Sequence, residues 1–217
     1  MRRKTAPAVP EHRPDPPRVA WRRQMRERVL AEARALAAEG GWDRVRVADL
    51  ALRAEVSRPS IYKEFGDRAG IGQALVLRET EAFLLGLAAV LHARRDDVGA
   101  ALEAGVAHAL AEAGDNPFVG AVLTAARGGT DALLPFLTSR PEPVFSNAWR
   151  LLADWLGEVA PGTPADRRLE AADLAVRLTL SHMLLPSPRT AETPARVSRA
   201  VCAVLGLPHL PPAATGT

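Results

Sequence analysis

Apolar residues recur every three or four positions along most of this chain, which is the spacing of one face of an α-helix. The first such segment precedes Gly40 and Gly41, which are typical of a helix end. Its apolar positions are Met25, Val29, Ala33, Leu36 and Ala37. β-branched residues are few, and glycine and proline collect between the periodic segments. The pattern therefore predicts an all-α protein.

Residues 46–65 predict two short helices joined by a tight turn. Val47, Leu50 and Ala51 fall on one face of the first helix. Ser57 is a good N-cap for the second, because its hydroxyl can accept a hydrogen bond from a free amide of the first turn. Pro59 follows within that turn, where a missing N–H costs little.

The second helix of this pair has two chemically different sides. Ile61 and Phe65 are four residues apart and point inward, whereas the outward side chains are basic or carry hydroxyl groups: Arg58, Ser60, Tyr62 and Lys63. A helix that buries one face and presents such groups on the other suits the major groove of DNA. An ordinary helical hairpin is the alternative interpretation at this point.

The rest of the chain predicts a second, larger set of helices. One runs from about residue 68 to 91, with Asp67 as its predicted N-cap, and the cluster at residues 94–97 caps the next, which ends near 113. Thr163 and Thr193 are each followed by proline, so both are predicted N-caps. The remaining helices are expected between Phe118 and Gly128, around 145–156, over 164–185 and over 193–205, with a short segment near 133–137.

These segments divide the chain into a proline-rich basic tail (1–20), a DNA-binding domain (21–80), a helical domain (81–206) and a second tail (207–217). Residues 1–80 carry a net charge of +6 and residues 81–217 a net charge of −3. Because attraction to phosphates supplies most non-specific DNA affinity, this asymmetry agrees with the motif. The first tail is either a solvated segment or a minor-groove arm, with contacts from Arg2, Arg3, Lys4, Arg13 and Arg18.

The run VSRPSIYKEFGDR (56–68), following a glycine-terminated helix with the Gly41-Trp42 pair, resembles the N-terminal domain of the TetR family of transcriptional regulators. The resemblance covers roughly residues 22–80. It implies a three-helix domain that binds double-stranded DNA and a larger helical domain that binds a small-molecule effector. It also implies a cytoplasmic homodimer, usually a repressor that the effector releases from a palindromic operator.

The resemblance assigns roles to the outward residues. Arg58, Ser60 and Lys63 correspond to readers of base edges or nearby backbone. Tyr62 corresponds to a tyrosine that donates its hydroxyl to a phosphate, and Arg68 stands in the place of a lysine that contacts phosphate.

Three positions depart from the family pattern. Arg46 replaces a capping threonine, which removes a side-chain acceptor and adds a possible phosphate contact. Glu55 replaces the turn glycine, and a non-glycine residue in a left-handed conformation costs about 1–2 kcal/mol. Glu64 replaces a histidine or other phosphate-contacting residue, and the DNA backbone would repel its carboxylate unless it accepts from a cytosine or pairs with Lys63 or Arg68. Glu64 is therefore interpreted as discriminating against some DNA sequences.

Aromatic residues concentrate in the middle of the second domain. They either fill its core or line a cavity for an apolar or amphipathic effector, and the candidates are Phe118, Phe145, Trp149 and Trp155. The helices over 164–185 and 193–205 have heptad-like apolar faces. These faces either form a dimer interface or pack within one chain, and the interface candidates are Leu174, Leu178, Val201 and Leu205.

No chemistry of another class is evident. The histidines have no metal-ligand spacing, no nucleotide or nucleophile motif is present, and no cofactor is expected. The clearest uncharged apolar run, residues 82–91, is too short to span a bilayer, and a single cysteine, Cys202, forms no internal disulfide. The rival hypothesis is a helical protein that binds a ligand or partner without DNA; an enzyme ranks third.

Overall fold

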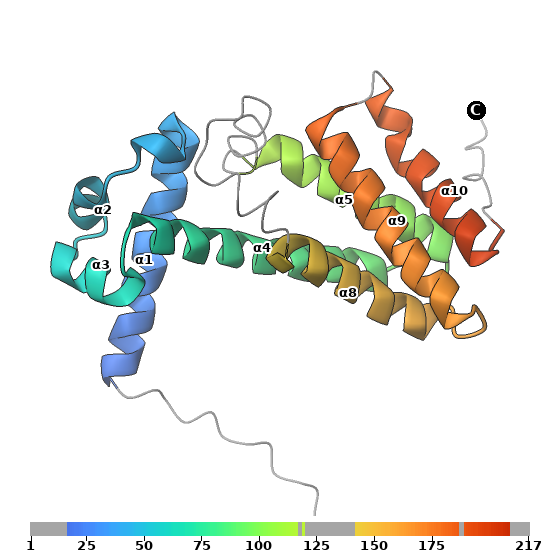
Figure 1. Cartoon of the computed structure of the whole chain (residues 1–217), viewed down its shortest axis with the longest axis horizontal. Helices are drawn as coiled ribbons and strands as arrows, with labels where there is room; N and C mark the ends of the chain where they lie inside the picture. The colour runs from blue at the N-terminus through green and yellow to red at the C-terminus, as the bar shows by residue number, and fades with distance from the viewer. Residues whose placement is uncertain (1–16, 117–118, 120–141, 187–188, 209–217) are drawn as a thin grey trace, which may run out of the picture.

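The computed structural model describes residues 17–116, 119, 142–186 and 189–208, and all regular secondary structure within them is helical (Figure 1). This confirms the predicted all-α class. The elements are α1 (Pro17–Gly40), the 3-10 turn η1 (Trp42–Arg44), α2 (Val47–Arg53), α3 (Arg58–Phe65), α4 (Arg68–His92), α5 (Val98–Asp115), α8 (Glu142–Val159), α9 (Ala165–Leu184), the 3-10 turn η2 (Thr190–Glu192) and α10 (Thr193–Leu205).

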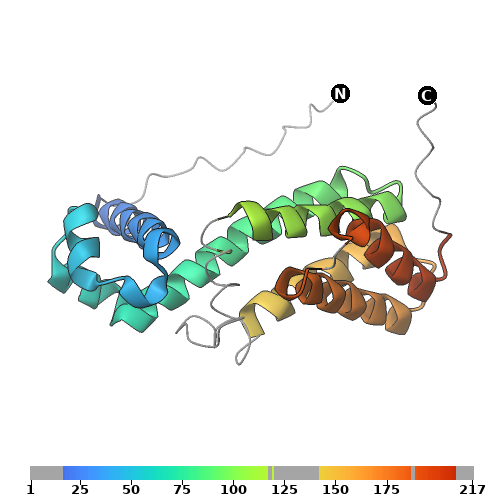
Figure 2. The same cartoon turned by 90° about the horizontal axis from the view of Figure 1, so that it is seen from above.

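The helices form two groups joined by α4 (Figures 1 and 2). In the first group, α1, α2 and α3 surround a core that includes Leu30, Leu50 and Ile61. The N-terminal half of α4 completes this core with Ile71 and Leu75. One continuous helix therefore begins inside the small domain and leaves it toward the other.

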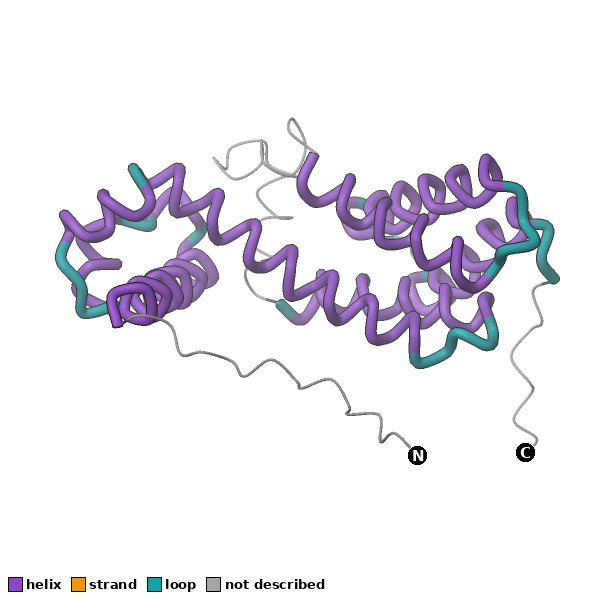
Figure 3. Tube along the Cα trace, turned by 90° about the horizontal axis from the view of Figure 1, so that it is seen from below, coloured by secondary structure: helices purple, strands orange, loops and turns teal. Residues whose placement is uncertain are grey.

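The second group packs around the C-terminal half of α4. Leu87 and Leu91 of α4 share a core with α5, α8, α9 and α10, and these five helices lie side by side in the tube view (Figure 3). α10 lies against both α5 and α9. The buried Ser198 hydroxyl of α10 donates to the Gly99 carbonyl of α5 at 2.7 Å, which fixes the register of these two helices.

Local capping follows the sequence prediction where the capping side chain lies three residues before the amide that donates to it. The Ser57 hydroxyl accepts from the Ser60 amide at 3.3 Å. Asp67 and Asp97 cap α4 and α5, accepting from Gly70 at 2.7 Å and Ala100 at 2.9 Å. Each of these side chains satisfies an amide that the helix itself leaves without a partner.

Two predicted caps are wrong. Pro164, not Thr163, is the N-cap of α9, and the buried Thr163 hydroxyl instead donates to the Leu205 carbonyl at 3.4 Å. Thr193 is the first residue of α10 rather than its cap, and its hydroxyl donates to the Arg189 carbonyl at 3.4 Å. In both cases a buried threonine donates to a carbonyl rather than accepting from an amide of the first turn; that carbonyl is 42 residues away for Thr163 and four residues away for Thr193.

The first helix also begins earlier than predicted. α1 starts at Pro17, so residues 17–20 are helical rather than part of an extended tail. The segment expected around 133–137 and the helix expected to carry Phe118 lie outside the described residues. No helix in the described part of the chain is both long and apolar enough to cross a membrane.

Candidate DNA-binding site

α2 and α3 meet at the turn that the sequence predicts. The turn closes with a hydrogen bond from the Val56 amide to the Ala51 carbonyl at 3.0 Å. Glu55 has a φ of 55°, and among the described residues it is the one non-glycine residue with a positive φ. A glutamate therefore adopts the left-handed conformation that glycine adopts more readily.

The two sides of α3 are arranged as predicted. Ile61 and Phe65 are buried in the core of the small domain. Arg58, Tyr62 and Lys63 are exposed on the opposite side, away from that core. The geometry thus presents two cations and a phenol on one continuous helix face, while their contacts with DNA stay a prediction.

Two of the predicted contact residues lie at helix starts. The Ser60 hydroxyl is partly buried and lies 2.8 Å from the Ser57 hydroxyl, so the two hydroxyls share a hydrogen bond in the first turn of α3. Arg46 is the exposed N-cap residue of α2, and its side chain makes no capping hydrogen bond. Its guanidinium is therefore not used to start the helix.

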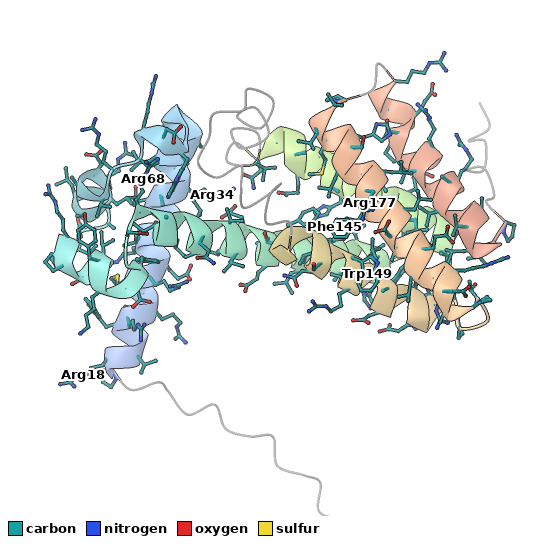
Figure 4. All side chains as sticks on the ribbon, viewed as in Figure 1. Arg18, Arg34, Arg68, Phe145, Trp149 and Arg177 are labelled. Carbon is teal, nitrogen blue, oxygen red and sulfur yellow. The ribbon has the colours of Figure 1, made fainter. Side chains whose placement is uncertain are left out.

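Arg68 is bound within the domain rather than extended toward solvent (Figure 4). Its Nη2 donates to the Trp42 carbonyl at 2.6 Å and to the Asp43 carboxylate at 3.3 Å. The guanidinium also lies over the Trp42 ring, 5.4 Å from its centroid. Arg68 therefore joins the start of α4 to η1, a structural contact that the sequence did not indicate.

Glu64 pairs with neither Lys63 nor Arg68. Its carboxylate accepts from Arg22 Nε at 2.5 Å and from Arg26 Nη1 at 3.3 Å, both on α1. The Glu64 side chain is only 8% exposed. This hydrogen bond raises the pKa of the Arg22 guanidinium above its ordinary value, so Arg22 stays charged. The end of α3 is thereby held against α1. The predicted pairing of Glu64 with Lys63 or Arg68 is wrong, whereas its contact with a cytosine stays a prediction.

The candidate effector residues in the second domain differ in their surroundings. Phe145 is half-buried, and the Arg177 guanidinium carbon lies 4.8 Å from the centroid of its ring. Trp149, on the same helix α8, is also half-buried (Figure 4). Trp155 is 2% exposed, and its indole N–H has no hydrogen-bond partner among the residues that the structure describes. Phe118 lies outside the described residues.

The candidate interface residues separate into two pairs. Val201 and Leu205 of α10 are 0% and 3% exposed within the core of their own subunit. They offer no surface to a second copy, so the alternative of packing within one chain holds for them. Leu174 and Leu178 of α9 are half-buried at the edge of the same core.

Comparison with known proteins agrees with this architecture. The family model described as bacterial regulatory proteins of the tetR family matches residues 29–75. The model described as the C-terminal domain of the bacterial tetracyclin repressor matches residues 97–203. The chain belongs to the TetR family of transcriptional regulators. It is therefore a regulator with a DNA-binding domain and a ligand-binding domain, and not an enzyme.

Three TetR-family relatives are informative. The HTH-type transcriptional regulator AlkX of Mycobacterium tuberculosis is 28% identical over 182 residues, which cover 84% of this chain and 85% of the relative. The crystal structure of the TetR family repressor AlkX from Dietzia, implicated in biodegradation of n-alkanes, superposes with a TM-score of 0.66 at 24% identity, covering 82% of this chain and 96% of that one. The crystal structure of RolR in complex with resorcinol superposes with a TM-score of 0.56 at 20% identity, and the match covers 88% of this chain and 92% of RolR.

Proposed function

We propose that this TetR-family protein binds a two-fold-symmetric operator as a homodimer in the cytoplasm and is a repressor that a small apolar or amphipathic effector releases. The observation that carries the proposal is the outward face of α3, where Arg58, Tyr62 and Lys63 are exposed opposite a buried apolar side. Arg58, Ser60 and Lys63 read bases or the adjacent backbone. Tyr62 and Arg46 contact phosphates. In the free protein Arg68 holds the start of α4 against η1 by donating to the Trp42 carbonyl, and a contact between Arg68 and a phosphate requires that hydrogen bond to open.

Selection from a pool of random duplexes tests the operator contacts. We expect wild-type protein to enrich a two-fold-symmetric site. Arg58→Ala or Lys63→Ala should lose about 1–3 kcal/mol of binding and relax sequence preference where the side chain reaches a base. Tyr62→Phe should weaken binding to all sequences alike. If no symmetric site is enriched, the proposal of a palindromic operator is wrong.

The effector is proposed to bind between the helices of the second domain, near α8. Trp155 supports an amphipathic molecule there, because a buried N–H without an acceptor costs about 1–3 kcal/mol. An oxygen on the effector would accept from that N–H while its apolar part lies against the surrounding side chains. The n-alkane connection of one relative and the resorcinol complex of another suggest an apolar chain or a phenol as starting points.

α4 is the proposed route from effector to operator. It has residues in both cores, and its 25 residues span about 37 Å at 1.5 Å per residue. Converting a 99:1 population of DNA-competent dimers to 1:99 requires about 5.5 kcal/mol of differential affinity. Burying about 220 Å² more apolar surface in one state, at ~25 cal/mol per Å², supplies that amount.

Paired probes test the effector proposal. 1-Dodecanol and resorcinol carry an oxygen acceptor, whereas n-dodecane has the apolar chain alone. We expect 1-dodecanol or resorcinol to shift tryptophan emission and release the operator more effectively than n-dodecane. Trp155→Phe should remove that preference and keep the fold, because it deletes the N–H and retains an aromatic ring. An unchanged preference in this variant would contradict the role of Trp155.

A further inference from the structure

The first two turns of α1 extend beyond the core of the small domain. The buried residues of α1 begin at Met25. Before it, residues 17–24, here called the α1 extension, are exposed except for the half-buried Ala20. The extension projects past α3, with Arg18 near its tip (Figures 1 and 4). Burial of apolar surface within the subunit therefore does not explain this length of helix.

The α1 extension is strongly basic. The extension itself carries three arginines and no acidic residue: Arg18, Arg22 and Arg23. The next turn of α1 adds Arg26, Glu27 and Arg28. Glu64 of α3 compensates part of this charge through Arg22 and Arg26. An excess of cations thus remains directly beside the C-terminal end of the proposed recognition helix, where it complements the charge of a DNA backbone.

Arg22 can hold Glu64 and still contact a second anion. Only its Nε donates to the carboxylate, and the guanidinium has further N–H groups at its other two nitrogens. The side chain is 66% exposed. Arg22 therefore both anchors the extension to α3 and has donors left for a second anion.

Two large apolar side chains accompany these cations. Val19 and Trp21 are 50% and 52% exposed. Scattered apolar residues on a surface are ordinary, but an indole among arginines presents a flat face and an N–H donor beside positive charge. That combination suits the sugar-phosphate edge of a nucleic acid, which offers apolar sugar faces and phosphate acceptors together.

We propose that the α1 extension is a second DNA-contacting surface, in which Arg18, Arg22 and Arg23 bind backbone phosphates beside the half-site contacted by α3 and Trp21 packs against the same backbone. The inference rests on the proposed DNA binding and adds a contact outside the helix-turn-helix. Such contacts carry no base information, so they raise affinity and lengthen the site without changing its consensus.

The test compares salt dependence of binding to a duplex that the full-length protein selects. Each phosphate contact contributes about 0.9 to the slope of log Kobs against log salt concentration. Arg18→Gln with Arg23→Gln should make the slope less steep by about 1.8 and leave the consensus unchanged. Arg150→Gln with Arg199→Gln is the matched control, because it removes the same two charges from exposed positions in the other domain and should leave the slope near that of wild type.

Two further readouts locate the contact. Shortening the duplex by about half a helical turn, ~5 base pairs, at each end should weaken wild-type binding and have little effect on the double variant. Bound duplex should protect tryptophan emission from acrylamide, and Trp21→Phe should remove most of that protection.

The outcomes separate the two proposals. If wild-type protein binds no duplex, DNA binding itself is wrong. If wild-type protein binds but the double variant keeps its slope and its response to flank length, the extension makes no DNA contact. Arginine-dependent binding of the extension to vesicles of anionic lipid, with the DNA slope unchanged, would also overturn the inference.

Discussion

Gly70 lies where the first turn of α4 passes the end of α3, and there is no room for a side chain. A Cβ atom on Gly70 would lie 1.9 Å from the Phe65 carbonyl oxygen. The Gly70 amide is also the donor to the Asp67 cap. The close approach of two helix ends therefore requires glycine here for space, rather than for an unusual φ.

We expect Gly70→Ala to lower the free energy of unfolding by about 1–3 kcal/mol, the usual cost of overpacking, and to weaken DNA binding by displacing α3. Chemical denaturation measures the first effect. Gly114→Ala is the control, because a Cβ at Gly114 meets nothing within 4 Å in α5 and alanine favours a helix. Equal stability of the two variants would contradict the steric argument.

At the scale of elements, α1 and α4 are joined by a partly buried network around Arg78. Its Nη2 donates to the Leu30 carbonyl at 3.4 Å and to Glu79 at 3.0 Å. Its Nη1 lies 3.6 Å from Glu27, and Glu79 also pairs with Arg34 at 3.1 Å. Any displacement of α4 by an effector must therefore carry α1 along or break these contacts.

Arg78→Met should lower the free energy of unfolding by about 1–2 kcal/mol, because it keeps the apolar stem but removes the hydrogen bonds to the Leu30 carbonyl and to Glu79, which keeps only Arg34 as a partner. Arg53→Met is the control. Arg53 pairs with Glu39 at 3.0 Å and 3.1 Å on the surface, where water screens both charges, so its loss should be smaller. A larger loss for Arg53→Met, measured by denaturation, would contradict the role of the Arg78 network.

Elements and caps were predictable from the sequence where the deciding contacts are local. Ser57 and Asp67 cap amides three residues away, so the sequence alone indicates them. Glu64 was misread because its partner Arg22 lies 42 residues earlier, and no sequence period connects the two. Val201 was misread for another reason, since an apolar helical face looks the same whether a neighbouring helix or a second subunit covers it.

At the scale of the whole molecule, α4 is not the sole connection between the domains. Val119, which follows α5, packs against the core of the small domain. Its amide also lies 3.4 Å from the Asn116 side-chain oxygen, close to the end of α5. The chain just after α5 therefore contacts the DNA-binding domain at a place separate from α4.

The proposed homodimer needs an apolar surface that the subunit itself does not bury. With Val201 and Leu205 buried in their own subunit, the remaining apolar surface of α9 at Leu174 and Leu178 is the proposed interface. Leu178→Arg should give folded monomers by light scattering, because a dimer interface would bury an unpaired charge. These monomers should bind DNA poorly, since two half-sites need a two-fold protein.

Val201→Arg is the control that distinguishes a residue of the dimer interface from a residue of the subunit core. It places a cation at a fully buried position and should unfold the subunit, with loss of helical circular dichroism, whereas Leu178→Arg should retain it. A Leu178→Arg protein that stays dimeric would place the interface elsewhere. One that unfolds like Val201→Arg would assign Leu178 to the core, and α9 would then need another face, such as the exposed Leu169, to meet a second copy.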